Sequence, residues 1–207
     1  MQNKPKFDDL NFYQIKKQNL WDDGYVVVTE EDIPFSSQEW LDIKDIIAKL
    51  KYETDAYGDS GEPMELEYFR IKESYKPQIY HERLWELLTS EKIFCLYKGL
   101  TGLQDPYLDR CQIHKLKEAG YLGRHYDIAQ HPQYQYTFIF FLEDDYDGGE
   151  LLFYKEETPI PLRPKARSLV VNCSRIAHEI SLVKRGTRTT LCCFFSEGKP
   201  LPKAAQA

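Results

Sequence analysis

The sequence predicts a mainly β domain, either a sandwich or a barrel, with helices packed against its flank. Helical patterns are confined to the first half of the chain, and short β-rich runs separated by turn residues follow from about residue 107. Aromatic residues make up 14% of the 207 residues, which argues against disorder. A chain of this length forms one domain of ordinary size and buries roughly 70% of its unfolded surface.

The first half of the chain combines a polar start, one strand and helices. Residues 1–20 are polar and are expected to form a loosely ordered leader. Tyr25–Thr29 is a β-branched run that predicts a strand. Ser36, with Glu39 three residues later, forms a capping-box pattern, and apolar residues at helical spacing continue to about Leu50. A helix with one buried face is therefore expected here.

A loop is expected at Asp55–Pro63, and residues 79–99 read as helical with a break near Thr89 and Ser90. The β-rich half contains the runs Tyr107–Lys115, Tyr134–Leu142, Glu150–Tyr154, Ser168–Cys173 and Thr187–Phe195. We expect a single domain over residues 21–196 and a flexible tail over residues 197–207.

Charge and composition exclude several classes of partner. The net charge is −6, which disfavours binding to phosphate backbones, so no nucleic acid is expected. No apolar run approaches the ~18 residues of a membrane span, and no secretory signal pattern is evident. The five cysteines lack CxxC spacing, which favours reduced thiols and a cytoplasmic protein.

His125 and Asp127 form an H-x-D pattern, and His178 follows 53 residues later, after an apolar run. In a strand, residues i and i+2 lie on one face, so both side chains can converge on one point. Two imidazoles and one carboxylate are the ligands of non-haem Fe(II) oxygenases, which keep three adjacent positions open. An H-x-D triplet is also common by chance, and a surface His and Asp at a turn is the alternative.

Arg188 heads the apolar strand run and shares one face with Thr190. If that face points inward, the buried guanidinium requires an anion, and the planar fork of arginine binds a carboxylate through two hydrogen bonds. Thr190 could donate a hydrogen bond to the same carboxylate. The alternative is that Arg188 points into solvent as an edge-strand charge.

Together these patterns, with His178, Ile180, Val183, Gly186 and Arg188 in the order H-x-[IV]-x-x-V-x-x-G-x-R, resemble the prolyl 4-hydroxylase-like branch of the 2-oxoglutarate/Fe(II) dioxygenases. The resemblance covers about residues 107–196. The stretches that carry it are Gly120–Asp127, Asp145–Leu151 and Pro164–Phe195.

The resemblance implies a double-stranded β-helix (jelly roll) core over about residues 107–196. It implies iron on His125, Asp127 and His178, and Arg188 on the distal carboxylate of 2-oxoglutarate, with O2 as cosubstrate and ascorbate as a candidate reductant. The branch often has Tyr nine residues before the first His, where this chain has Leu116. The polar residues that could replace that contact are Thr190, Tyr121, Gln112 and His114.

The expected function is hydroxylation of a C–H bond in an amino-acid-like substrate, either a prolyl or other residue in a peptide or a free molecule. The alternatives are oxidation of a small biosynthetic metabolite, or a non-catalytic or cupin-like metal-binding jelly roll. A cupin-like protein would need the metal ligands but not Arg188.

Overall fold

The computed structural model describes residues 10–57, 63–72, 79–129 and 131–199. Its helices are α1 (Leu10–Asp23), η2 (Glu30–Asp32), α2 (Ser37–Ala48), α3 (Ile79–Leu88), α4 (Glu91–Thr101) and η3 (Asp127–Ala129). Its strands are β1 (Tyr25–Val28), β2 (Glu53–Tyr57), β3 (Pro63–Lys72), β4 (Pro106–Leu116), β5 (Tyr121–His125), β6 (Tyr136–Phe141), β7 (Asp147–Gly148), β8 (Leu151–Lys155), β9 (Thr158–Leu162), β10 (Leu169–Cys173), β11 (His178–Ile180), β12 (Val183–Arg185) and β13 (Arg188–Glu197).

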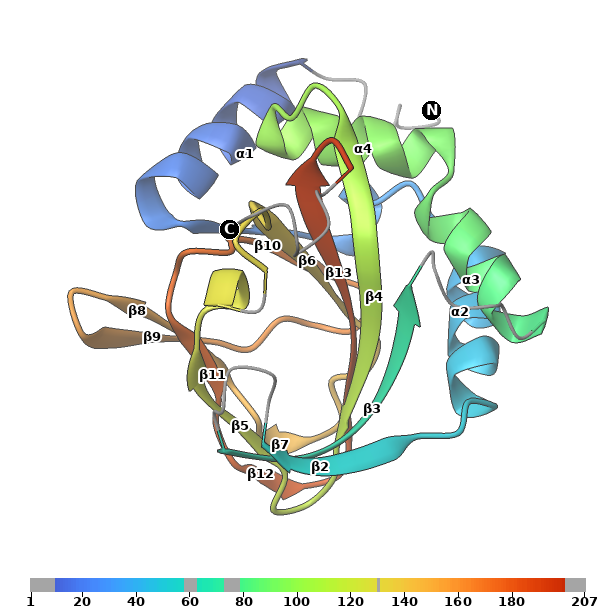
Figure 1. The fold of residues 1–207 in the computed structure, drawn as a ribbon, viewed down its shortest axis with the longest axis vertical. Coiled ribbons are helices and arrows are strands. Elements are labelled where there is room, and N and C mark those ends of the chain that lie inside the picture. The colour runs from blue at the N-terminus through green and yellow to red at the C-terminus, as the bar shows by residue number, and fades with distance from the viewer. Residues whose placement is uncertain (1–9, 58–62, 73–78, 130, 200–207) are drawn as a thin grey trace.

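The main sheet follows the order β1-β10-β6-β13-β4-β3-β5-β11-β8-β9, with β2 paired to β3. Strands distant in sequence are therefore neighbours, and each of these pairings is antiparallel. Figure 1 shows the strands curving around a common interior, with the helices α1 to α4 gathered on one side. This is the mainly β jelly roll with N-terminal flanking helices that the sequence predicted.

Two apolar clusters divide the core according to the faces of the sheet. One cluster packs the four α-helices against the outward face, which includes Phe138 and Phe140 of β6. The other fills the interior between the two halves of the sheet and includes Ile139 and Phe141. Because both faces of β6 are covered, its sequence is a continuous apolar run rather than an alternating one.

Helix α2 begins where the sequence predicted. The Ser36 hydroxyl accepts a hydrogen bond from the Glu39 amide, and the Glu39 carboxylate accepts one from the Ser36 amide, which completes the capping box. Lys92 of α4 donates to the same carboxylate at 2.6 Å and so links the two helices. Among the described residues, no helix combines the length and the apolar character needed to cross a membrane.

The structure differs from the sequence reading at three places. Residues 10–20, expected in a loose leader, lie in α1, where Leu20 is buried and the Tyr13 ring packs so closely on Gly99 of α4 that a Cβ there would lie 2.5 Å away. Residues 55–57 and Pro63 belong to strands rather than to a loop. Glu197, expected in the tail, ends β13. Residues 1–9, 58–62 and 200–207 of these expectations lie outside the described part.

Candidate functional site

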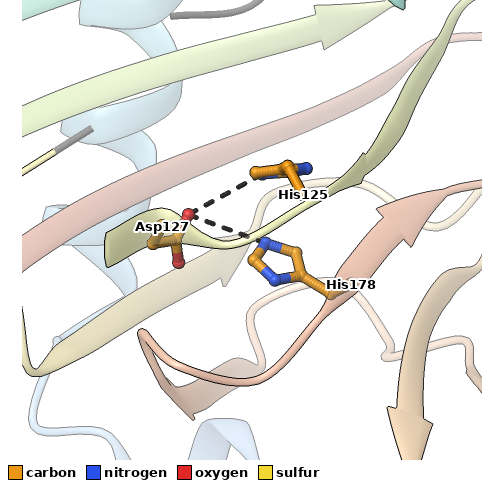
Figure 2. Close-up of side chains that lie close together, drawn as sticks. All are labelled: His125, Asp127 and His178. Carbon is orange, nitrogen blue, oxygen red and sulfur yellow. Dashed lines mark ion pairs between the residues drawn. The ribbon is translucent and has the colours of Figure 1, made fainter. Parts of the chain in front are cut away.

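Sheet pairing brings His125 and His178 side by side although 53 residues separate them in sequence. Strand β11 lies between β5 and β8, and His178 is the direct cross-strand partner of His125. Asp127 follows β5 at the start of η3, so a short turn, rather than continued strand alternation, directs its carboxylate. Figure 2 shows the three side chains pointing toward one another.

The three residues present one donor atom each to a common point. These atoms lie within 4.8 Å of one another, and all three residues are buried. The distance from Asp127 Oδ1 is 3.7 Å both to His125 Nε2 and to His178 Nε2. That separation is too long for a hydrogen bond but suits two ligands of one ion.

Backbone hydrogen bonds set the orientation of both imidazoles. His125 Nδ1 donates to the Gly123 carbonyl at 2.8 Å, and His178 Nδ1 donates to the Ile176 carbonyl at 3.1 Å. With the proton held on Nδ1, the Nε2 lone pair of each ring faces the common point. Burial lowers the pKa of His178 to about 4, so this ring is neutral at pH 7 and ready to bind a metal.

Two buried polar side chains hold the Asp127 carboxylate. Its Oδ2 accepts hydrogen bonds from Thr137 Oγ1 at 2.5 Å and from Asn172 Nδ2 at 3.3 Å, which leaves Oδ1 as the free ligand atom beside the two imidazole Nε2 atoms. Burial by itself raises the pKa of Asp127. The two imidazoles and the two hydrogen bonds outweigh burial and keep the pKa below its ordinary value, so the carboxylate is ionised.

The sequence reading missed Thr137 and Asn172. Each is a polar residue within an apolar strand run, at a position that strand pairing turns toward the interior. A polar residue inside such a run is a signal for a buried hydrogen-bonding role, but only the fold identifies Asp127 as its partner.

Replacing Thr137 by Val removes the shorter of the two hydrogen bonds and keeps the side-chain shape. We expect divalent metal affinity to fall about tenfold or more, because loss of such supporting contacts costs 10- to 100-fold. Titration of the metal-free protein with Fe(II) or Co(II) measures this. Thr101→Val is the matched control and should bind metal normally, because its buried hydroxyl bonds to the backbone of Tyr97 and Leu103 at the end of α4 and not to Asp127. Equal affinities in both variants would contradict the role of Thr137.

Arg188 lies inside the barrel rather than on a solvent-exposed edge. Its side chain is 1% exposed, and its guanidinium carbon lies 4.9 Å from the centroid of the Phe141 ring. Nη1 donates to Thr190 Oγ1 at 3.3 Å, whereas Nε and Nη2 have no hydrogen-bond partner in the described structure. Burial lowers its pKa from the ordinary value, but arginine stays charged in proteins. A buried cation with two open donors fits a carboxylate ligand.

The other residues considered for a contact with 2-oxoglutarate do not all lie on the inner face of their strands. Leu116 and His114 of β4 pair with Arg188 and Thr190 respectively, and Gln112 follows two residues further along, so all three share the inner face. Tyr121 does not, because its neighbour Leu122 packs in the interior cluster and alternation turns Tyr121 to the opposite face. His114 is thus the polar residue level with Thr190.

Comparisons with known proteins agree with this geometry. Residues 111–196 match the family model described as the 2OG-Fe(II) oxygenase superfamily, in which 2OG denotes 2-oxoglutarate. No curated protein sequence matches the chain. An oxidoreductase of the 2OG-Fe(II) oxygenase family from Burkholderia pseudomallei has a similar structure, with a TM-score of 0.79 and 23% identity over 90% of this chain and 92% of that one.

Two further structures share the fold at lower identity. A prolyl hydroxylase from Trichoplax adhaerens, in complex with a hypoxia-inducible-factor peptide fragment, has a TM-score of 0.66 and 14% identity, covering 92% of this chain and 91% of that one. The epimerase SnoN from nogalamycin biosynthesis, in complex with Fe3+, alpha-ketoglutarate and nogalamycin RO, has a TM-score of 0.67 and 13% identity, covering 91% and 85%.

Proposed function

We propose that this chain, whose residues 111–196 match the 2OG-Fe(II) oxygenase superfamily model, is a 2-oxoglutarate/Fe(II)-dependent dioxygenase that hydroxylates a C–H bond of an amino-acid-like substrate. One observation carries the assignment of the site. The donor atoms of His125, Asp127 and His178 face one point, and Arg188 offers two open donors within the same interior. A jelly roll that bound a structural metal would have no physical need for that arginine.

The three ligands fit ferrous iron. Two neutral imidazoles and one carboxylate leave three coordination positions open, and the single carboxylate offsets only part of the 2+ charge. When bound, iron and 2-oxoglutarate supply the chemistry that activates O2. The chain's own contribution is to hold the ligands in register through Thr137, Asn172 and the backbone carbonyls, so that the ligand set is organised before the metal arrives.

Arg188 would bind the distal carboxylate of 2-oxoglutarate through Nε and Nη2, which lie on one edge of the guanidinium and match a carboxylate in geometry. The Thr190 hydroxyl, now beside Nη1, would contribute a further hydrogen bond. His114 is the cross-strand partner of Thr190 and is the residue we assign to the second contact, in place of the tyrosine that Leu116 replaces. The surrounding apolar side chains, Phe141 among them, exclude water from this pair of charges.

The Trichoplax relative is in complex with a peptide and SnoN with a small molecule, so the fold accommodates both. The alternative is a small biosynthetic metabolite that is not an amino acid. All five cysteines are free, which supports a reducing, cytoplasmic location. The acidic net charge supports a partner other than nucleic acid.

Anaerobic titration of the metal-free protein with Fe(II) and then 2-oxoglutarate tests the assignment. We expect the weak visible absorption band that keto acids produce on ferrous iron. Iron binding without the band would replace this proposal with a cupin-like or non-catalytic jelly roll. No iron binding at all would mean that the three residues form no metal site.

A further inference from the structure

Tyr146 is a buried tyrosine in the segment between β6 and β7, and its side chain is only 1% exposed. Its backbone carbonyl accepts a hydrogen bond from the Arg163 guanidinium, whose carbon lies 5.5 Å from the centroid of the Tyr146 ring. These two contacts hold the backbone and the ring of Tyr146 in place. The iron and cosubstrate contacts described above do not include this residue.

The side chains of Tyr146 and Arg188 meet beside Gly149. A Cβ on Gly149 would lie 3.1 Å from Arg188 Cδ and 3.4 Å from Tyr146 Cε2, so both side chains border the same glycine. Burial raises the pKa of the Tyr146 hydroxyl, and the nearby charges of Arg188 and Arg163 lower it by a smaller amount. The hydroxyl therefore keeps its proton at neutral pH and can donate a hydrogen bond close to the Arg188 guanidinium.

Tyr146 and Arg188 together present buried donors for which the chain provides no acceptor. Within the described residues, the Tyr146 hydroxyl and Arg188 Nε and Nη2 all lack a hydrogen-bond partner. Arginine can only donate, so even a Tyr146 oxygen that accepted a hydrogen bond from Arg188 would keep its own proton unbonded. Leu116, the cross-strand partner of Arg188, has an apolar side chain and offers no acceptor. Because buried polar groups are nearly always hydrogen-bonded, these donors need an acceptor from a bound molecule.

A carboxylate matches this group of donors in both charge and geometry. The guanidinium is positively charged and the Tyr146 hydroxyl is neutral, so the pair favours an anion. A carboxylate has two oxygens with about four acceptor positions, and Arg188 Nε and Nη2 occupy only one edge of it. Positions on the carboxylate oxygens therefore stay open for the hydroxyl of Tyr146.

We infer that the Tyr146 hydroxyl donates a hydrogen bond to the distal carboxylate of 2-oxoglutarate, beside the two hydrogen bonds from Arg188. This contact adds to those assigned to Thr190 and His114, and it comes from the segment between β6 and β7 rather than from β4 or β13. Tyr146 thereby helps to select keto acids that carry a second carboxylate. The inference rests on the proposed function and adds a binding residue to its cosubstrate site.

Calorimetric titration of the iron-loaded Tyr146→Phe protein under anaerobic conditions tests this inference. The probes are 2-oxoglutarate and 2-oxopentanoate, which has the same carbon chain and keto acid end but no distal carboxylate. We expect the Kd for 2-oxoglutarate to rise about tenfold or more, because hydrogen bonds to a charged group are among the strongest. The Kd for 2-oxopentanoate should stay at its wild-type value, since the lost hydroxyl has no carboxylate to contact there.

Tyr97→Phe is the matched control. The Tyr97 hydroxyl is also buried without a partner in the described structure, but it belongs to the apolar cluster beneath the helices rather than to the barrel interior. This variant should bind both keto acids as the wild type does. A circular dichroism spectrum checks the fold of each variant, and Tyr146→Met gives the same comparison of the two acids if Tyr146→Phe does not fold.

A Tyr146→Phe protein that binds 2-oxoglutarate as tightly as the wild type would overturn the inference. An equal loss of affinity for both keto acids would overturn it as well, because the hydroxyl would then act away from the distal carboxylate. Failure of the proposed function is distinguishable from these results, because in that case the wild-type protein itself lacks the visible band of the iron and 2-oxoglutarate complex.

Discussion

Replacing His178 by Ala should abolish binding of Fe(II) at concentrations that saturate the wild-type protein. The site would retain one imidazole and one carboxylate, and the Nε2 atom that lies 3.7 Å from Asp127 would be lost. Loss of a mere supporting contact costs 10- to 100-fold in metal affinity, so we expect loss of a ligand to exceed about 100-fold. Iron titration followed by visible spectroscopy measures both the binding and the disappearance of the 2-oxoglutarate band.

His131→Ala is the control for the loss of an imidazole. His131 stacks on Tyr134 with ring centroids 5.0 Å apart and is not among the three residues of the metal cluster. The His131→Ala protein should bind iron as the wild type does. If His178→Ala also binds iron normally, the cluster is not the metal site. A circular dichroism spectrum separates either result from misfolding, because His178 is a buried strand residue.

Replacing Arg188 by Met should raise the Kd for 2-oxoglutarate at least about 100-fold while iron binding persists. Two charge-assisted hydrogen bonds are lost, each contributing about 1.5–3 kcal/mol. Methionine is apolar and of similar length, and a buried charge replaced by a well-packed apolar residue is often neutral or stabilising. The thermal midpoint without 2-oxoglutarate should therefore stay level or rise. Calorimetric titration of the iron-loaded protein measures the Kd.

A purely structural role for Arg188 gives the opposite pattern, in which the thermal midpoint falls and 2-oxoglutarate binds as before. Arg188→Lys refines the result, because lysine keeps the charge and loses the planar fork. It should bind 2-oxoglutarate with an affinity between those of wild type and Arg188→Met. Arg83→Met is the matched control, because the Arg83 side chain is exposed on α3, and it should alter neither the affinity for 2-oxoglutarate nor the thermal midpoint.

Sequence patterns predicted the helices and strands that residues close together in the sequence determine. The capping box at Ser36 and Glu39 predicted the start of α2, and the apolar runs predicted β4, β6, β8, β10 and β13 within a few residues. Helix α1 was missed because its sequence is polar and its stability comes from packing against α4, such as Tyr13 on Gly99. Strand β3 was not predicted either, and its pairing partners β4 and β5 lie far along the chain.

The sequence by itself determined which residue types compose the candidate site. The spacing along the chain is enough to identify the H-x-D pattern, the later His and the Arg ten residues beyond it. The resemblance to the 2-oxoglutarate/Fe(II) dioxygenases depends on this spacing. Spacing also placed Arg188 and Thr190 on the same face of their strand, because side chains alternate with a period of two, but it left open whether that face is the inner or the outer one.

Only the tertiary structure decided which face is the interior and what meets there. Antiparallel pairing of β11 with β5 brings His178 to His125, and pairing of β13 with β4 turns Arg188 inward beside Phe141. The same pairings select Thr137 and Asn172 as partners of Asp127. The physical reason is that these contacts are long-range: the sheet's register creates them, and no segment of the chain encodes them alone.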